Sequence, residues 1–522
     1  MPASTEKIDK VVITNSTALN AKYGSVGEQE IMRAVQNLVA EDGKRGMVTR
    51  LYCLDDKTAM GGINASAVDQ PADPQQNKDA VDAIYKAVTP DYLMILGSID
   101  IVPLQDLENV MYAQEGDMDE LAPGDLPYAC EAGYSRQPRD FCGPTRILGR
   151  LPDLTGATDP SYLVGLLETA ATYEQYSLDS YHPYFGIAAE KFKGSTALSL
   201  TAAFGDAKSL ETVPPEGENW TNALLTRLSH FVNCHGALND SRFFGQPADE
   251  AHQNEFPVAL DAAYLNNRIT KGTVVATECC YGAQLFDPTV NGGQAGMANT
   301  YLMNKAYGFF GSTTIAYGPD DYNDAADLIC QYFMRSLLRG ASVGRAALEA
   351  RQEFLHSASL AEASNLKTIA QFNLYGDPSI TPIKLPHTAA LAHMALTASV
   401  REARAERRYD LFSRGLALSG SQPILKKLES TDVAAKLSLM EKTAAEHGIT
   451  MGAVLTFKVE APPNAKAIPL GLMAKEPFPG HVHIIFSRGD RDMKGPRVFH
   501  RVVLVVKEVD GKIVSVKKLF SR

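Results

Sequence analysis

Apolar runs of strand length alternate with amphipathic stretches along the first part of the chain. Residues 10–14 (KVVIT), 47–54 (MVTRLYCL) and 92–96 (YLMIL) are rich in β-branched and aliphatic side chains. Between them, residues 28–39 and 79–88 place apolar residues at the spacing that lines one face of a helix. Strands that alternate with helices predict a mostly parallel β-sheet with helices on both faces.

The same order repeats from about residue 149 onward. The predicted strands there are 227–233, 272–278 and 308–312, and the predicted helices include 162–173 and 295–305. These segments extend the prediction of an α/β fold to about residue 385.

The pattern changes after Pro386. Two charged helices are predicted at about 399–413 and 422–447, and predicted strands follow them. The pair Asp510-Gly511, which separates two alternating apolar runs, predicts a β-hairpin. The tail is therefore predicted to be a mixed α+β unit that ends in an antiparallel sheet.

Length and composition are those of a globular protein with several domains. The chain has 522 residues, of which 45% are hydrophobic and 21% charged. This length indicates about three units, because one hydrophobic core rarely serves more than about 200 residues. We predict an N-terminal α/β subdomain at 1–145, a second α/β subdomain at 146–388 and a helical plus antiparallel β domain at 389–522.

Charge is shared unequally between the body and the tail. From residue 401 onward there are 22 Lys and Arg against 13 Asp and Glu, a net charge of +9, and the rest of the chain carries 28 against 48, a net charge of −20. The basic tail is expected to dock on the acidic body or to bind a partner protein, unless these are merely solvated faces. A nucleic-acid partner is not expected.

The first ten residues (MPASTEKIDK) lack the apolar stretch of a secretory signal, and no later run reaches about 18 apolar residues. The expected location is therefore the cytoplasm, without a membrane anchor. The seven cysteines are odd in number and irregularly spaced, so we expect free thiols instead of a disulfide framework.

Two predicted strands end in reactive side chains followed by a glycine. Residues 230–236 read HFVNCHG and residues 274–282 read VVATECCYG. Neighbouring parallel strands end at the same edge of a sheet, so His235 can meet Cys279 or Cys280 there. A thiol is mostly protonated at neutral pH, and a nearby imidazole can accept its proton, which makes a Cys/His dyad the natural hypothesis.

The glycine after the histidine could take part in the same reaction through its backbone N–H. The backbone N–H groups of Gly236 and Cys279 could bind the oxygen that becomes negative during acyl transfer. Two other interpretations exist for these segments. Buried cysteines are usually inert apolar residues, and the adjacent pairs Cys234-His235 and Cys279-Cys280 lack the spacing with which one loop wraps a zinc ion, so no metal is expected.

Further segments resemble the gingipain-like peptidases, family C25, of the caspase-fold clan. The segments are PDYLMILGSIDIVP, ILGRLP, GFFGSTT and FNLYGDPSI, which stand in the family's order around the His-Gly and Cys-x-x-Gly strand ends. Together they cover about residues 10–385. The resemblance implies a caspase-like α/β core and a cysteine peptidase.

The resemblance also bears on single residues. The clan commonly places a glycine three residues after the nucleophile, which pairs Cys279 with Gly282 and makes Cys279 the expected nucleophile. The caspase spacing instead selects Cys280, which is the alternative. An acidic residue after the Gly-Arg pair, here Asp153 or Asp159, is implied to orient His235, or it simply caps the helix that follows.

The expected function is that of a cysteine endopeptidase that cleaves proteins or peptides through a thioester intermediate, without a cofactor. The residue preferred before the scissile bond stays open, since a basic preference needs a carboxylate that no motif places. The alternative function is a catalytically silent caspase-like scaffold that binds a partner.

Overall fold

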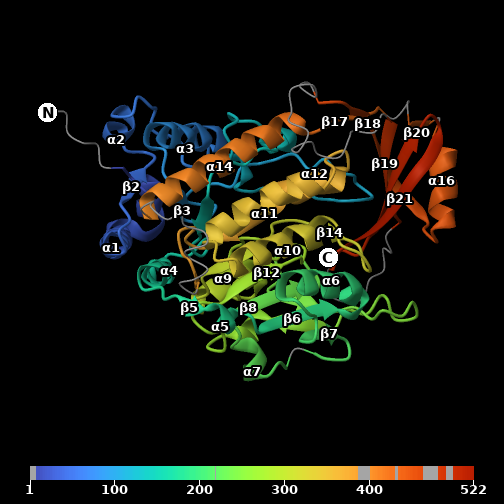
Figure 1. The fold of residues 1–522 in the computed structure, drawn as a ribbon, viewed down its shortest axis with the longest axis horizontal. Coiled ribbons are helices and arrows are strands. Elements are labelled where there is room, and N and C mark those ends of the chain that lie inside the picture. Colours follow the sequence, from blue (N-terminus) through green and yellow to red (C-terminus); the bar gives the residue numbers. More distant parts are fainter. Residues whose placement is uncertain are drawn as a thin grey trace.

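The computed structural model describes residues 7–217, 219–385, 400–429, 433–434, 436–462, 480–488 and 498–522. The boundary predicted between residues 388 and 389 lies outside these ranges. Within them the chain folds into a large α/β body with an antiparallel sheet at one end, which confirms the predicted fold class (Figure 1).

A ten-stranded sheet forms the centre of the body. In spatial order its strands are β2 (Thr49–Cys53), β1 (Lys10–Thr14), β3 (Tyr92–Leu96), β4 (Leu148–Leu151), β15 (Phe372–Tyr375), β13 (Gly308–Ser312), β12 (Val274–Thr277), β8 (Ser229–Asn233), β6 (Tyr184–Ala189) and β7 (Leu210–Val213). The runs KVVIT, YLMIL and VVAT form strands because both faces of this sheet are covered, and nearly every residue in them is buried.

The sheet is almost entirely parallel. All neighbouring strands pair in parallel except β13 and β15, which are antiparallel. The carboxyl ends of β13, β12, β8, β6 and β7 therefore lie at one edge of the sheet. The segment after β3 reaches the same edge, because Ile99 lines one cavity with Leu238, Tyr281 and Thr313, which follow β8, β12 and β13.

Helices cover both faces of the sheet. They are α1 (Ser16–Lys44), α3 (Pro74–Val88), α4 (Ser161–Ala171), α6 (Lys193–Phe204), α9 (Met297–Met303), α10 (Ala325–Leu338), α11 (Val343–Ser357) and α12 (Ala363–Gln371). One row contains α1, α4 and α9, and α6, α10 and α11 form another. The two rows lie on opposite faces, because right-handed crossovers that move in opposite directions along a sheet place their helices on opposite sides.

Shorter elements complete the body. They are α2 (Lys57–Gly61), α5 (Leu178–Tyr181), α7 (Asn222–Leu225), α8 (Ala262–Leu265), the small sheet of β9 (His235–Gly236), β10 (Arg242–Phe244) and β11 (Val258–Asp261), the pair β5 (Tyr176–Ser177) and β16 (Ile383–Lys384), and β14 (Tyr317–Gly318).

The C-terminal part contributes α14 (Val400–Ser421), α16 (Leu437–Glu446) and most of a second sheet. That sheet has the order β14-β21-β20-β19-β18-β17, with β17 (Ile424–Lys427), β18 (Met451–Glu460), β19 (Gly480–Ser487), β20 (Val502–Val509) and β21 (Lys512–Ser521). The helix predicted at 422–447 is wrong in its first half, where β17 forms instead. The predicted hairpin is confirmed, since Asp510 and Gly511 join β20 to β21 with positive φ angles.

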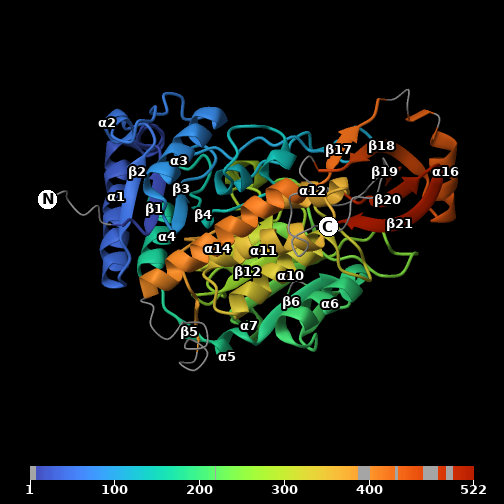
Figure 2. The same ribbon diagram turned by 45° about the horizontal axis from the view of Figure 1, so that its top comes forward.

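The C-terminal part contacts the body at several places. Helix α14 lies along α11, and the C-terminal sheet stands at one end of the molecule with α16 on its outer side (Figure 2). The last strand pairs with β14 of the body, so the chain end marked C in Figure 1 lies beside β14. Apolar residues of this sheet, among them Leu455, Phe486 and Leu519, belong to the same core cluster as the body. None of the helices in the described ranges has the length and apolar character needed to cross a membrane.

Candidate active site

The two strands that end in the predicted histidine and cysteines are neighbours. β8 and β12 pair in parallel, with Val232 opposite Thr277. His235 follows the end of β8, and Cys279 and Cys280 follow the end of β12, so all three lie at one edge of the sheet. All three side chains are fully buried.

His235 is held by a glutamine. Its Nε2 lies 2.9 Å from Oε1 of Gln246, whose own Nε2 donates to the carbonyl oxygen of Gln253. Since this glutamine oxygen can only accept, the proton of the neutral imidazole sits on Nε2 of His235. Its Nδ1 has no hydrogen-bond partner among the residues the structure describes, which leaves that lone pair available to accept a proton.

Aromatic rings enclose the imidazole of His235. Its centroid lies 5.0 Å from that of Phe192, 5.2 Å from that of Phe256 and 5.8 Å from that of His500. This burial, followed by the charge of His500, lowers the pKa of His235 to about 3. The imidazole is therefore neutral in this conformation.

The two cysteines have different surroundings. The Cys279 thiol lies between β8 and β12, where its sulfur accepts from the Cys234 N–H at 3.4 Å. The Cys280 sulfur accepts from the N–H of Ala316 at 3.2 Å, beyond the end of β13. Burial raises the pKa of Cys279 to about 12 and also raises the pKa of Cys280.

The backbone at Cys280 is arranged for a close contact. Tyr281, the next residue, has a φ of 54°, which is rare for a bulky side chain. A Cβ on Gly236 would lie 1.8 Å from the carbonyl oxygen of Cys280, so only glycine fits after the histidine. The His-Gly and Cys segments thus touch through their main chains.

Asp153 does not lie beside His235. It follows β4, which β15, β13 and β12 separate from β8, and its carboxylate binds Lys22, Tyr23 and the N–H of Ser98. The order in which distant strands pair has no local signal in the sequence. Gln246, which carries no signal in the sequence, instead contacts the imidazole.

An arginine from the far end of the chain reaches the same edge. The carbonyl oxygen of Arg522 accepts from the N–H of Cys280 at 3.2 Å, and its guanidinium is fully buried. Nη2 lies 3.0 and 3.1 Å from the two carboxylate oxygens of Asp327, and Nε lies 3.8 Å from Glu278. Neither carboxylate was a predicted site residue.

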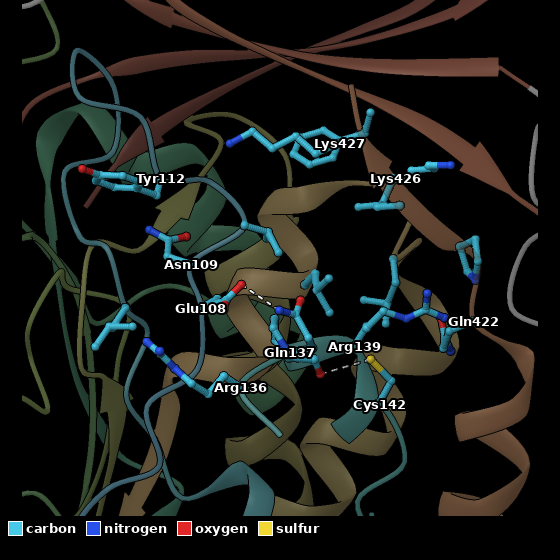
Figure 3. Close-up of a pocket in the computed structure, with 18 of the residues that line it drawn as sticks. Glu108, Asn109, Tyr112, Arg136, Gln137, Arg139, Cys142, Gln422, Lys426 and Lys427 are labelled. Carbon is cyan, nitrogen blue, oxygen red and sulfur yellow. Dashed lines mark hydrogen bonds between the residues drawn. The ribbon is translucent and has the colours of Figure 1, made fainter. Parts of the chain in front are cut away.

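A cavity of about 850 Å³ lies elsewhere. It opens between the segment 108–142 and β17, whose side chains face each other across it (Figure 3). Arg136, Arg139, Lys426 and Lys427 make much of its wall basic. His235 and the two cysteines do not line it.

The fold and the two strand ends together define an α/β protein with a histidine and two cysteines at one edge of its central sheet. Residues 229–383 match the sequence model of the family described as Peptidase family C25. The chain therefore contains a domain of peptidase family C25, the gingipain family, and the predicted resemblance is confirmed. This domain runs from β8 to β16 and includes both strand ends.

Other comparisons add little. No curated protein matches the chain. One solved structure, described as "Structure of Protease", superposes with a TM-score of 0.48 at 11% sequence identity and covers 98% of this chain and 96% of that chain.

Proposed function

We propose that the chain is a cysteine endopeptidase that hydrolyses peptide bonds in proteins, with His235 as the general base and Cys280 as the nucleophile. The observation that carries this proposal is the environment of Cys280 inside a C25 domain. Its N–H donates to the main-chain oxygen of Arg522, directly after β21, and its sulfur accepts from the N–H of Ala316. The first contact is of the kind that an oxyanion site makes, and the second favours the thiolate.

The choice of Cys280 replaces the sequence-based preference for Cys279. The Cys279 thiol packs against the N–H of Cys234 between two strands, where a substrate backbone has no room. Cys280 instead belongs to the turn that faces Arg522 and Ala316. The caspase spacing, with glycine two residues after the nucleophile, agrees with Cys280 and Gly282.

The proposed reaction transfers an acyl group twice. The imidazole of His235 accepts the thiol proton, and the sulfur attacks the carbonyl carbon of the scissile bond. The oxygen that becomes negative accepts from the N–H of Cys280 and, as the sequence suggested, from that of Gly236. The amine leaves with the proton of the imidazolium, and water then hydrolyses the thioester to a carboxylate and the free thiol.

The protonation state of His235 suits this role. Gln246 holds the proton on Nε2 and leaves Nδ1 to accept the thiol proton. The pKa of about 3 belongs to the buried imidazole. A site opened to water restores the pKa of a histidine toward about 6.5, where it is an effective base at neutral pH.

The adjacent cysteines provide a matched test, because both are fully buried. Cys280→Ala should lower kcat/KM on a peptide library by about 10³-fold or more, since the covalent step is lost. Cys279→Ala should stay within about threefold of the wild type, and thermal melting should show that both variants fold. The opposite pattern would make Cys279 the nucleophile. A chain without thiol-dependent hydrolysis would be the silent scaffold.

A further inference from the structure

The last residues of the chain form a strand along the proposed active site. β21 pairs with β14 in antiparallel register, with Ser521 opposite Tyr317 and Phe520 opposite Gly318, and the N–H of Arg522 donates to the carbonyl oxygen of Ala316 at 3.0 Å. Main-chain hydrogen bonds of this kind bind a peptide irrespective of its side chains. β14 follows β13, the neighbour of β12, so its position is that of a substrate-binding edge.

The main-chain oxygen of Arg522 contacts the proposed oxyanion donor. It accepts from the N–H of Cys280 at 3.2 Å, as the oxygen of a scissile carbonyl would. Ser521 and Arg522 are fully buried, and Phe520 nearly so. No substrate can reach the thiol while this segment is in place.

The side chain of Arg522 fills a pocket built for a guanidinium. Asp327 contacts it through both carboxylate oxygens, the carbonyl oxygen of Pro319 accepts from Nη2 at 2.6 Å, and the guanidinium carbon lies 4.0 Å from the centre of the Phe192 ring. A Cβ on Gly318 would lie 2.3 Å from Nη2, so the absence of a side chain there makes room for the group. A buried charge requires such pairing.

Charged contacts hold the C-terminal sheet over the site. Lys517 of β21 lies 2.6 Å from Asp324 and 2.9 Å from Glu362, and Lys507 of β20 lies 2.6 Å from Glu362. Next to the His-Gly segment, Val498 forms a β-bridge with Ala237. The net positive charge of the tail and the net negative charge of the body favour this docking.

We propose, on the basis of the peptidase function above, that residues 520–522 occupy the substrate site as an internal pseudosubstrate. Arg522 occupies the pocket for the residue before the scissile bond. The peptidase is closed by its own C-terminal strand and opens when this strand leaves β14. A substrate with arginine before the scissile bond would compete with Arg522 for Asp327 in this pocket.

The test compares two variants of the full chain that each remove one positive charge from the last strand region. Arg522→Gln removes the group in the pocket, whereas Lys512→Gln changes an exposed residue at the start of β21. On a short peptide with arginine before the bond, Arg522→Gln should raise kcat/KM by about tenfold or more, because a larger fraction of molecules is open. Lys512→Gln should leave kcat/KM unchanged.

The outcomes separate the closure from the peptidase function. Equal activity of the wild type and Arg522→Gln would overturn the closure and leave the peptidase standing. Inactivity of every form, Arg522→Gln included, would overturn the proposed function and the closure with it.

Hydrogen exchange on the wild type covers the case in which Arg522→Gln does not fold. A peptide aldehyde that ends in arginine should displace the strand and increase amide exchange in β21, whereas the matching aldehyde that ends in glutamate should not. Protection of β21 that stays unchanged at saturating arginine aldehyde would contradict the proposal.

Discussion

Two pockets of this molecule differ in what fills them. The cavity between the segment 108–142 and β17 is large, open and basic (Figure 3), whereas the pocket beside Cys280 is filled by the fully buried side chain of Arg522. The filled pocket has the carboxylate of Asp327, a carbonyl acceptor and a glycine that makes room for the guanidinium. Cavity size therefore points away from the proposed catalytic centre when part of the chain occupies that centre.

Among the predicted changes, the largest is expected from Asp327→Asn, which alters the filled pocket. It should lower the preference for an arginine peptide over the same peptide with citrulline by about 100-fold, because loss of one partner of a buried ion pair costs roughly 3 kcal/mol or more. The measured quantity is the ratio of the two kcat/KM values. Closure by the tail lowers kcat/KM for both substrates by the same factor, so this factor cancels from the ratio.

The open cavity supplies the control for that experiment. Lys427→Gln changes its basic wall and should leave the same ratio unchanged, since Lys427 belongs to β17, away from Cys280. A loss of arginine preference in this variant, with none in Asp327→Asn, would place substrate selection in the cavity instead.

A smaller effect is expected from pH. Burial is the main cause that lowers the pKa of His235 to about 3 and that of His500 to about 4, whereas both should titrate near about 6.5 in an open site. The closed form thus binds fewer protons, so its stability is complete above about pH 6.5 and is lost as the pH falls toward these values. The hydrogen-exchange protection factors of the β21 amides, which are corrected for intrinsic exchange, should decrease as the pH falls. The decrease should be up to about tenfold per pH unit for each histidine.

A variant isolates the histidine contribution to this pH effect. Burial raises the pKa of Asp327 and Glu278, which acts in the opposite direction, because the closed form then retains protons. His500→Phe keeps a ring against His235 and should flatten the dependence between about pH 4 and 6.5. An identical pH dependence in His500→Phe would show that His500 does not contribute to it.

The sequence predicted the body of the fold well, because its strands are continuous apolar runs with covered faces. It also predicted that the ends of β8 and β12 meet, since parallel neighbours end at one edge. The spatial order of distant strands has no local signal, and three strands separate β4, which precedes Asp153, from β8, which precedes His235. The same applies to β17, a short strand inside a stretch with helical periodicity.

The proposed substrate pocket was not predicted from the sequence, because its parts come from separate elements. Glu278 follows β12, Asp327 lies in the first turn of α10 and Gly318 belongs to β14, while Arg522 arrives from the other end of the chain. A glutamate directly before two cysteines, at the end of an apolar strand, was the one local signal. Its pairing with an arginine more than 200 residues away could be found only in three dimensions.

The central claim is that Arg522 occupies the cleavage position, and a chain extended past Arg522 by a short tag tests it most directly. The extended wild type should lose the tag by cleavage directly after Arg522, as read from its intact mass. The extended Cys280→Ala variant, and an extended Arg522→Glu variant, should retain it. A wild type that hydrolyses arginine peptides yet keeps its tag, or loses it equally in Cys280→Ala, would contradict the account.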